Sequence, residues 1–288
     1  MKTRIAGFVL AAALSACSPD APPPAAVISP PKVQPVPPPM PDLADLKFRD
    51  WSEVAPETHL EIALPPGAEA LSWRFEEARR FGYDYGETLT QKIHRTLGEH
   101  SEEHLSREKN RGTFEFIGAK DRTALCRVKI QTSELFVDGQ PAARPPHEEN
   151  PESASEAVVE PDGTPDLKKA GGRADARFYL LTLLALRPGE RPLQHGQVRT
   201  KIAGARKVER WDCVRIESEF ESTIEGARLR QIFKGRAVGY FCPAEGRFIR
   251  AGAIVATSSR RLELTKDGAA WVVTRLDAVS QSRVTLLE

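Results

Sequence analysis

Four cysteines are the most reactive side chains of this 288-residue chain, and Cys17 stands apart from the other three. It follows a short apolar run, Ile5 to Leu14, and two small residues, Ser15 and Ala16. A thiolate is a strong nucleophile that is readily alkylated, and small residues let a protease reach the neighbouring peptide bond. The sequence therefore places a nucleophilic side chain directly after a short apolar run and two small residues.

Leu14-Ser15-Ala16-Cys17 resembles the lipobox of bacterial lipoproteins, and Lys2 and Arg4 resemble the basic start of a signal peptide. The resemblance implies cleavage before Cys17, a diacylglycerol thioether on its sulfur, and acylation of the new amine. The preceding apolar run is too short to cross a bilayer as a helix. We therefore expect a signal peptide over residues 1–16. An ordinary secretory peptide with a coincidental cysteine is the alternative.

Prolines dominate the stretch after the lipobox, residues 17–42, which holds many of the chain's 23 prolines. Proline donates no backbone hydrogen bond and favours extended, uncored chain. We expect a disordered tether between a lipid anchor and a folded domain, with a ligand for a proline-recognition module as the alternative. Ser18, and not an Asp, follows the cysteine, which resembles the sorting signal of lipoproteins that reach the outer membrane. The predicted location is therefore the cell envelope, lipid-anchored, at the outer membrane.

Three cysteines remain once Cys17 is set aside, so at most one intrachain disulfide can form among them. Disulfides persist outside the cytoplasm. Cys213 and Cys242 lie on successive strand-like runs across the turn at Glu225-Gly226, and we predict that they pair. A simple hairpin register leaves them a few residues out of opposition, so the pair requires a bulge or the end of a strand. Cys126 is interpreted as a buried free thiol.

The segment His100-Ser101-Glu102-Glu103-His104 fits the pattern H-x-x-E-H. It resembles the motif of inverted zinc peptidases, which implies zinc ligands at His100 and His104 and a water-activating base at Glu103. Those motifs lie on a long helix backed by a core. Here the surroundings are polar and stand between strand-like runs, which favours a solvated hairpin tip or a short surface helix. We expect no resident metal and no cofactor, with adventitious metal binding at the two histidines.

The fold expected for residues 43–288 is a single, mainly β domain of the α+β kind, because apolar and polar residues alternate in most segments. In residues 83–97, Tyr83, Tyr85, Leu89, Ile93 and Leu97 fall on one face. Long, half-polar strands with short turns favour an antiparallel meander that forms a curved sheet or half-barrel. Charge is nearly balanced, with 41 basic and 40 acidic residues, which argues against a nucleic-acid partner.

Two segments interrupt the alternation. Residues 141–174 are acidic, with almost no large apolar side chain, and we expect a disordered insertion there. Residues 175–187 are nearly continuously apolar from Phe178, rich in Leu and Ala, and end before Pro188-Gly189, which predicts one buried helix on the sheet. This outline is similar to the lipoprotein-carrier fold, in which a curved sheet wraps a helix and takes acyl chains into an apolar cavity.

The sequence therefore predicts a non-enzymatic, membrane-anchored lipoprotein whose sheet binds an apolar ligand or an envelope protein. The patterns for serine hydrolases, dinucleotide folds and P-loops are missing, and the carboxylates are scattered. The alternative is a surface-tethered zinc hydrolase that uses His100 and His104.

Overall fold

The computed structural model describes residues 35–48, 51, 54, 59–142, 155–166, 184, 186–193, 196–266 and 268–287. The predicted signal peptide and Cys17 lie outside these residues, as does most of the predicted helix at 175–187. Within the described part, no helix is both long enough and apolar enough to cross a membrane.

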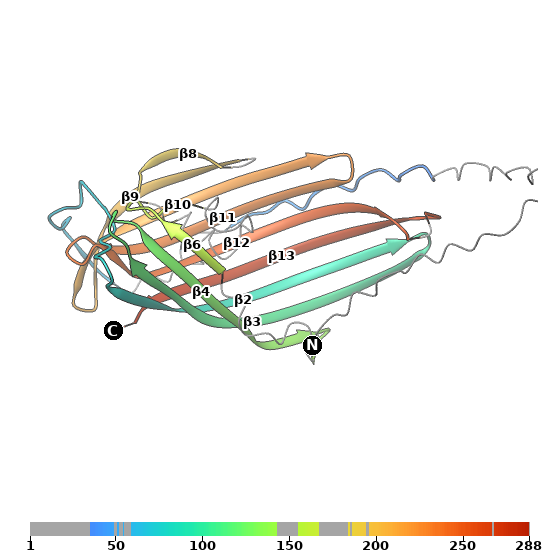
Figure 1. Cartoon of the computed structure of the whole chain (residues 1–288). Coiled ribbons are helices and arrows are strands. Elements are labelled where there is room, and N and C mark those ends of the chain that lie inside the picture. The colour runs from blue at the N-terminus through green and yellow to red at the C-terminus, as the bar shows by residue number, and fades with distance from the viewer. Residues whose placement is uncertain are drawn as a thin grey trace, which may run out of the picture. The chain divides into compact units, whose positions relative to one another are not determined.

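Within the described residues, thirteen antiparallel strands form one sheet, whose arrangement Figure 1 shows. They are β1 (Leu60–Ile62), β2 (Arg80–Leu97), β3 (His100–Gly118), β4 (Ala124–Val137), β5 (Gln140–Pro141), β6 (Ser155–Val159), β7 (Pro165–Asp166), β8 (Gly189–Leu193), β9 (Gly196–Val208), β10 (Trp211–Gly226), β11 (Leu229–Cys242), β12 (Arg247–Leu264) and β13 (Trp271–Leu286). The predicted mainly β, antiparallel meander is confirmed, and the described residues contain no α-helix.

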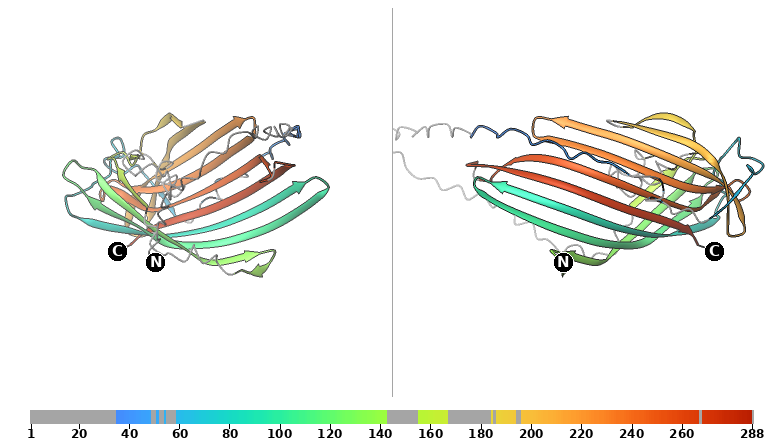
Figure 2. Two further views of the ribbon diagram at one scale, coloured as in Figure 1. Left: turned by 45° about the vertical axis from the view of Figure 1, so that its right-hand side comes forward. Right: turned by 180° about the vertical axis from the view of Figure 1, so that it is seen from behind.

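The sheet consists of two meanders that are joined by a pairing between distant parts of the sequence. Its order is β1-β9-β10-β11-β12-β13-β2-β3-β4-β6-β7, with β8 beside β9 and β5 beside β4. The last strand, β13, pairs with β2 along its whole length, from Val272↔Leu97 to Leu286↔Tyr83. The sheet is open and curved (Figure 2). The β2–β3, β10–β11 and β12–β13 turns lie toward one end, which we call the turn end.

One face of the sheet, which we call the core face, carries Tyr83, Tyr85 and Phe114. At the end opposite the turn end, an aromatic cluster covers it. The cluster consists of Trp73, Phe75, Phe81, Tyr83, Phe116, Phe241 and Phe248, with ring centroids 5.1 to 6.4 Å apart. Such pairs contribute about 0.5–1.5 kcal/mol each beyond burial. We call this end the aromatic end.

The other face, which we call the strap face, holds a second buried cluster of Val208, Cys213, Val238, Tyr240, Cys242 and Ile249. Trp51 and Val54 pack against that cluster. Residues 35–48, which we call the strap, lie on the same face nearer the turn end. The indole N–H of Trp271 donates to the Pro35 carbonyl at 2.7 Å, and the Arg260 guanidinium donates to the Asp42 carbonyl at 2.9 Å.

Two sequence expectations differ from the structure, and a third lies mostly outside the described residues. Residues 35–42 of the expected tether make ordered contacts in the strap, because their carbonyls satisfy the buried donors of Trp271 and Arg260. The expected disordered insertion contains β6 and β7, because Ala157 and Val159 alternate into the core. The predicted helix has three described residues; two of them, Leu184 and Leu186, are buried in the core.

Candidate functional site

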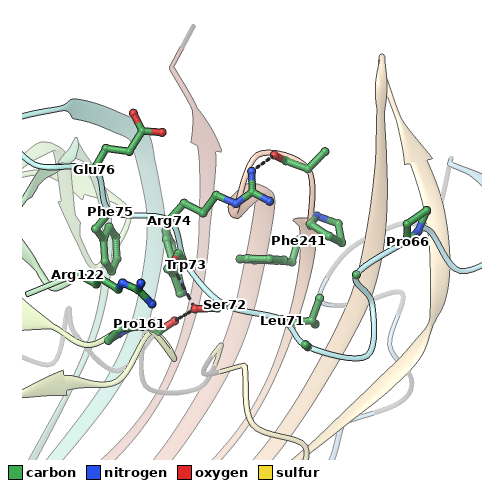
Figure 3. A pocket seen from close by; sticks show the side chains of 14 residues that line it. Pro66, Leu71, Ser72, Trp73, Arg74, Phe75, Glu76, Arg122, Pro161 and Phe241 are labelled. Atoms are coloured by element: carbon green, nitrogen blue, oxygen red, sulfur yellow. Dashed lines mark hydrogen bonds between the residues drawn. The ribbon is translucent and has the colours of Figure 1, made fainter.

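A pocket of about 650 Å³ opens at the aromatic end, beside the segment that leads into β2 (Figure 3). Its lining includes Leu71, Trp73 and Phe241, with Pro161 and Pro243 at its sides. These side chains are apolar and come from the 66–76 segment, the β6–β7 turn, the end of β11 and the β11–β12 turn. The pocket can therefore accept an apolar group.

Backbone hydrogen bonds hold the 66–76 segment against two turns. The Trp73 amide donates to the Pro161 carbonyl, and the Arg74 amide donates to the Gly246 carbonyl, each at 2.8 Å. The Arg74 guanidinium also donates to the Ala244 carbonyl at 2.8 Å. Gly246 has φ +64°, and an added Cβ there would lie 2.3 Å from the Arg74 side chain. These contacts therefore fix the backbone of the segment that carries Leu71 and Trp73 into the pocket lining.

Positive charge stands at the rim of this pocket. Arg122 is exposed in the β3–β4 turn, and no acidic partner faces its guanidinium among the described residues. Glu76 is bound to Arg79 at 2.9 Å. A neighbouring pocket of about 550 Å³ shares Leu71 and Pro161 and contains the Arg187–Asp162 ion pair, at 2.7 Å. Neither lining contains a histidine or cysteine among its described residues.

The exposure of apolar side chains on the core face increases from the aromatic end to the turn end. Along β2, Tyr83 and Tyr85 are buried, Leu89 and Ile93 are half-buried, and Leu97 is 41% exposed. The neighbouring strand repeats this pattern, since Leu276 of β13 lies directly opposite Ile93 and is half-buried. Polar residues stand between these apolar ones. The face can therefore take a molecule that has both apolar and polar parts.

The two histidines of the H-x-x-E-H segment lie on extended chain. His100 begins β3, and four strand residues of about 3.3 Å each separate the two imidazoles by about 13 Å. The helical geometry that the zinc motif requires is absent, because this segment pairs with Ile93–Leu97 of β2. His104 instead binds the Asp138 carboxylate through Nδ1 at 2.9 Å. Within the described residues, no group of three metal-ligating side chains gathers.

Hydrogen bonding shifts the pKa values of both His104 and Asp138. The Asp138 carboxylate raises the pKa of His104, and His104 in turn lowers the pKa of Asp138, helped by the Leu105 amide, which donates to the same carboxylate. Both side chains are about half exposed, at 49% and 51%. The pair ties the β2–β3 hairpin to the β4–β5 turn.

The three cysteines of the described part are buried, unpaired thiols. Cys213 and Cys242 occupy opposing positions, one step beyond the Val214↔Phe241 pair of the β10–β11 ladder. The sequence expectation that they lie a few residues apart was wrong. The loop consists of Ala227 and Arg228, so Gly226 pairs with Leu229, and no bulge between β10 and β11 is needed. Burial raises the pKa of the Cys126 thiol.

No family model matches this chain, and no curated protein matches it. A solved structure entitled "Lipid-protein interactions in lipovitellin" shares 10% identity, with a TM-score of 0.44, over 75% of this chain and 26% of that chain. A DUF1329 family protein from Desulfovibrio piger shares 9% identity, with a TM-score of 0.15, over 67% of this chain and 83% of that chain. Neither likeness assigns a function. The described residues form an open antiparallel sheet on which part of one apolar face is exposed.

Proposed function

We propose that this chain is a non-enzymatic, lipid-anchored protein of the bacterial cell envelope, placed at the outer membrane. Its sheet binds an amphiphilic ligand with an acyl chain on the uncovered part of the core face. The lipobox Leu14–Cys17 supports the anchor, and the proline-rich residues after it support a spacer. An anchor with two or more acyl chains is stable in a membrane, whereas one chain binds marginally.

The observation that carries the binding proposal is the stepwise exposure of apolar side chains along β2. Each half-buried Leu or Ile on the core face leaves apolar surface in water. Covering such surface contributes about 25 cal/mol per Å². An acyl chain laid across Leu89, Ile93 and Leu276 would bury this surface, while the polar residues between them would face a headgroup or water.

Binding of a fluorescent acyl probe, dansylaminoundecanoic acid, tests the site. The double variant Ile93→Gln/Leu276→Gln places polar groups at the centre of the uncovered face. We expect it to weaken probe binding about tenfold, or about 1.4 kcal/mol. The matched control is Val279→Gln, which lies on β13 but on the strap face and is 41% exposed in the native chain. Equal binding by both variants would remove the core face as the site and leave a scaffold.

The mass of the N-terminal peptide of the mature protein tests the anchor separately. We expect a peptide that begins at Cys17 and carries a thioether-linked diacylglycerol and an N-acyl group. The Cys17→Ser variant provides the control, since it removes the sulfur that forms the thioether. An unmodified cysteine in the native protein would contradict the anchor and the outer-membrane location together.

A further inference from the structure

The strap fixes the point at which the tether leaves the folded domain. Its path is set by three contacts on the strap face: Trp271 to the Pro35 carbonyl, Arg260 to the Asp42 carbonyl, and the Ala44 amide to the Ser258 hydroxyl at 3.0 Å. Trp271, Arg260 and Ser258 are 9%, 5% and 0% exposed. The strap thus accepts from the buried donors of Trp271 and Arg260, donates to the buried Ser258 hydroxyl, and has a defined direction along the sheet.

That direction places Pro35 at the turn end. Trp271 is the first residue of β13, directly after the β12–β13 turn. The next residue, Val272, lies opposite Leu97, where β2 enters its own turn. Figure 1 shows the strap, in blue, passing from the turn end along the sheet toward its middle. Beyond it, Arg236 lies 5.1 Å from the Trp51 ring, farther from the turns.

The length of chain between the anchor and the strap limits how the domain can sit on a membrane. Pro35 follows Cys17 by 18 positions. In polyproline form these residues reach about 55 Å. The 18-residue strand β12 spans about 60 Å from the turn end toward the aromatic end. The aromatic end could therefore touch the membrane only with the tether drawn back along the whole sheet.

We propose that the turn end of the sheet faces a lipid bilayer surface and that the aromatic end points away from it. This orientation rests on the lipid anchor proposed above. It follows from the exit point of the strap and not from apolar exposure, because both ends carry exposed leucines, Leu97 at one and Leu64 at the other. The uncovered part of the core face then lies on the membrane side, where an acyl chain can pass between bilayer and sheet.

Energy transfer from single labels to acceptor lipids tests the orientation. The full lipidated protein is placed in nanodiscs of phosphatidylethanolamine and phosphatidylglycerol with headgroup acceptors. A donor dye is attached at Glu99→Cys in the β2–β3 turn, or at Lys120→Cys in the β3–β4 turn at the aromatic end. Both positions are exposed, whereas the three native cysteines of the described part are buried. We expect at least twofold higher transfer from position 99, and equal or reversed transfer would overturn the orientation.

Two further readouts separate this inference from the anchor. Trp271→Phe keeps an aromatic ring but removes the N–H that donates to the Pro35 carbonyl, so the free tether lengthens. The contrast, which is the difference in energy transfer between labels at positions 99 and 120, should then fall by half or more. Trp211→Phe, at the opposite end of the sheet, is the matched control and should keep the contrast. A contrast that Trp271→Phe leaves intact would overturn the role of the strap. Flotation of the unlabelled protein with vesicles reports the anchor alone, and failure to float would overturn both proposals.

Discussion

Cys213 of β10 and Cys242 of β11 lie directly opposite one another, buried on the strap face of the sheet. The Cys213 thiol donates to the Trp211 carbonyl at 3.8 Å. Interaction with Cys213 lowers the pKa of the Cys242 thiol, and the backbone amides of Glu245 and Ala244 lower it further. The same contact raises the pKa of Cys213. Cys242 is therefore the thiol that ionises first and the better nucleophile.

We predict that this pair forms a disulfide in an oxidising compartment. The Cys242 thiolate attacks one sulfur of a disulfide oxidant and displaces the other as a thiol, which leaves a mixed disulfide on Cys242. Cys213 then attacks the Cys242 sulfur and displaces the second thiol, so that two protons and two electrons leave the pair and the oxidant becomes two thiols. The cross-link should stabilise the fold by about 2–4 kcal/mol. Thiol titration of the denatured, unreduced protein should find one free thiol, Cys126. Three free thiols in protein from the envelope would contradict the pairing.

Gly235 leaves space for the Phe220 ring across the β10–β11 pair. A Cβ on Gly235 would lie 1.8 Å from that ring. We expect Gly235→Ala to lower the free energy of unfolding by about 2–3 kcal/mol, because the ring must move within a packed core. Gly226→Ala on the neighbouring strand meets its nearest atom at 3.6 Å and is the matched control. Urea unfolding of both variants measures the difference, and similar losses would refute the close packing.

The His104–Asp138 pair gives a pH-dependent contribution with a defined window. The raised pKa of His104 means that its contribution is full below the unfolded value of about 6.5 and is lost as the pH rises through the folded pKa. The lowered pKa of Asp138 means that its contribution is present above the unfolded value of about 3.8 and is lost as the pH falls through the folded pKa. The pair therefore stabilises the fold from weakly acidic pH to near neutrality.

Asp138→Asn tests this window. We expect an NMR titration to show a lower pKa for His104 in this variant, and the stability difference from the native chain to shrink above neutral pH. An unchanged pKa of His104 would show that the contact with Asp138 is absent in solution.

The sequence was sufficient for much of the fold, because alternation records which side chains face the core. Tyr83, Tyr85 and Leu97 share one face of β2 as predicted; the two tyrosines are buried, whereas Leu97 is exposed because it lies at the turn end. The β13–β2 pairing could not be predicted, since no local pattern specifies which distant strands are neighbours. β6 was missed because its apolar core, Ala157 to Val159, is short and has acidic flanks.

The candidate site was less accessible to prediction than the fold. The pocket wall depends on contacts such as Trp73 to Pro161, between segments far apart in the chain. Cys213 and Cys242 lie opposite one another because the β10–β11 loop consists of two residues, Ala227 and Arg228. When the turn is expected one or two residues earlier, the strand register shifts and the two cysteines no longer face each other. The strap was hidden because a proline-rich composition indicates extended chain but not the surface on which it lies.

Native mass spectrometry of the protein, expressed as the full chain in a bacterium and extracted from its membranes in detergent, tests the central claim most directly. The proposed function predicts a population whose mass exceeds that of the lipidated chain by one amphiphile with an acyl chain. That population should diminish in the Ile93→Gln/Leu276→Gln variant and persist in Val279→Gln. A lipidated chain without bound amphiphile in the native protein, or an equal bound population in both variants, would contradict a ligand on the core face.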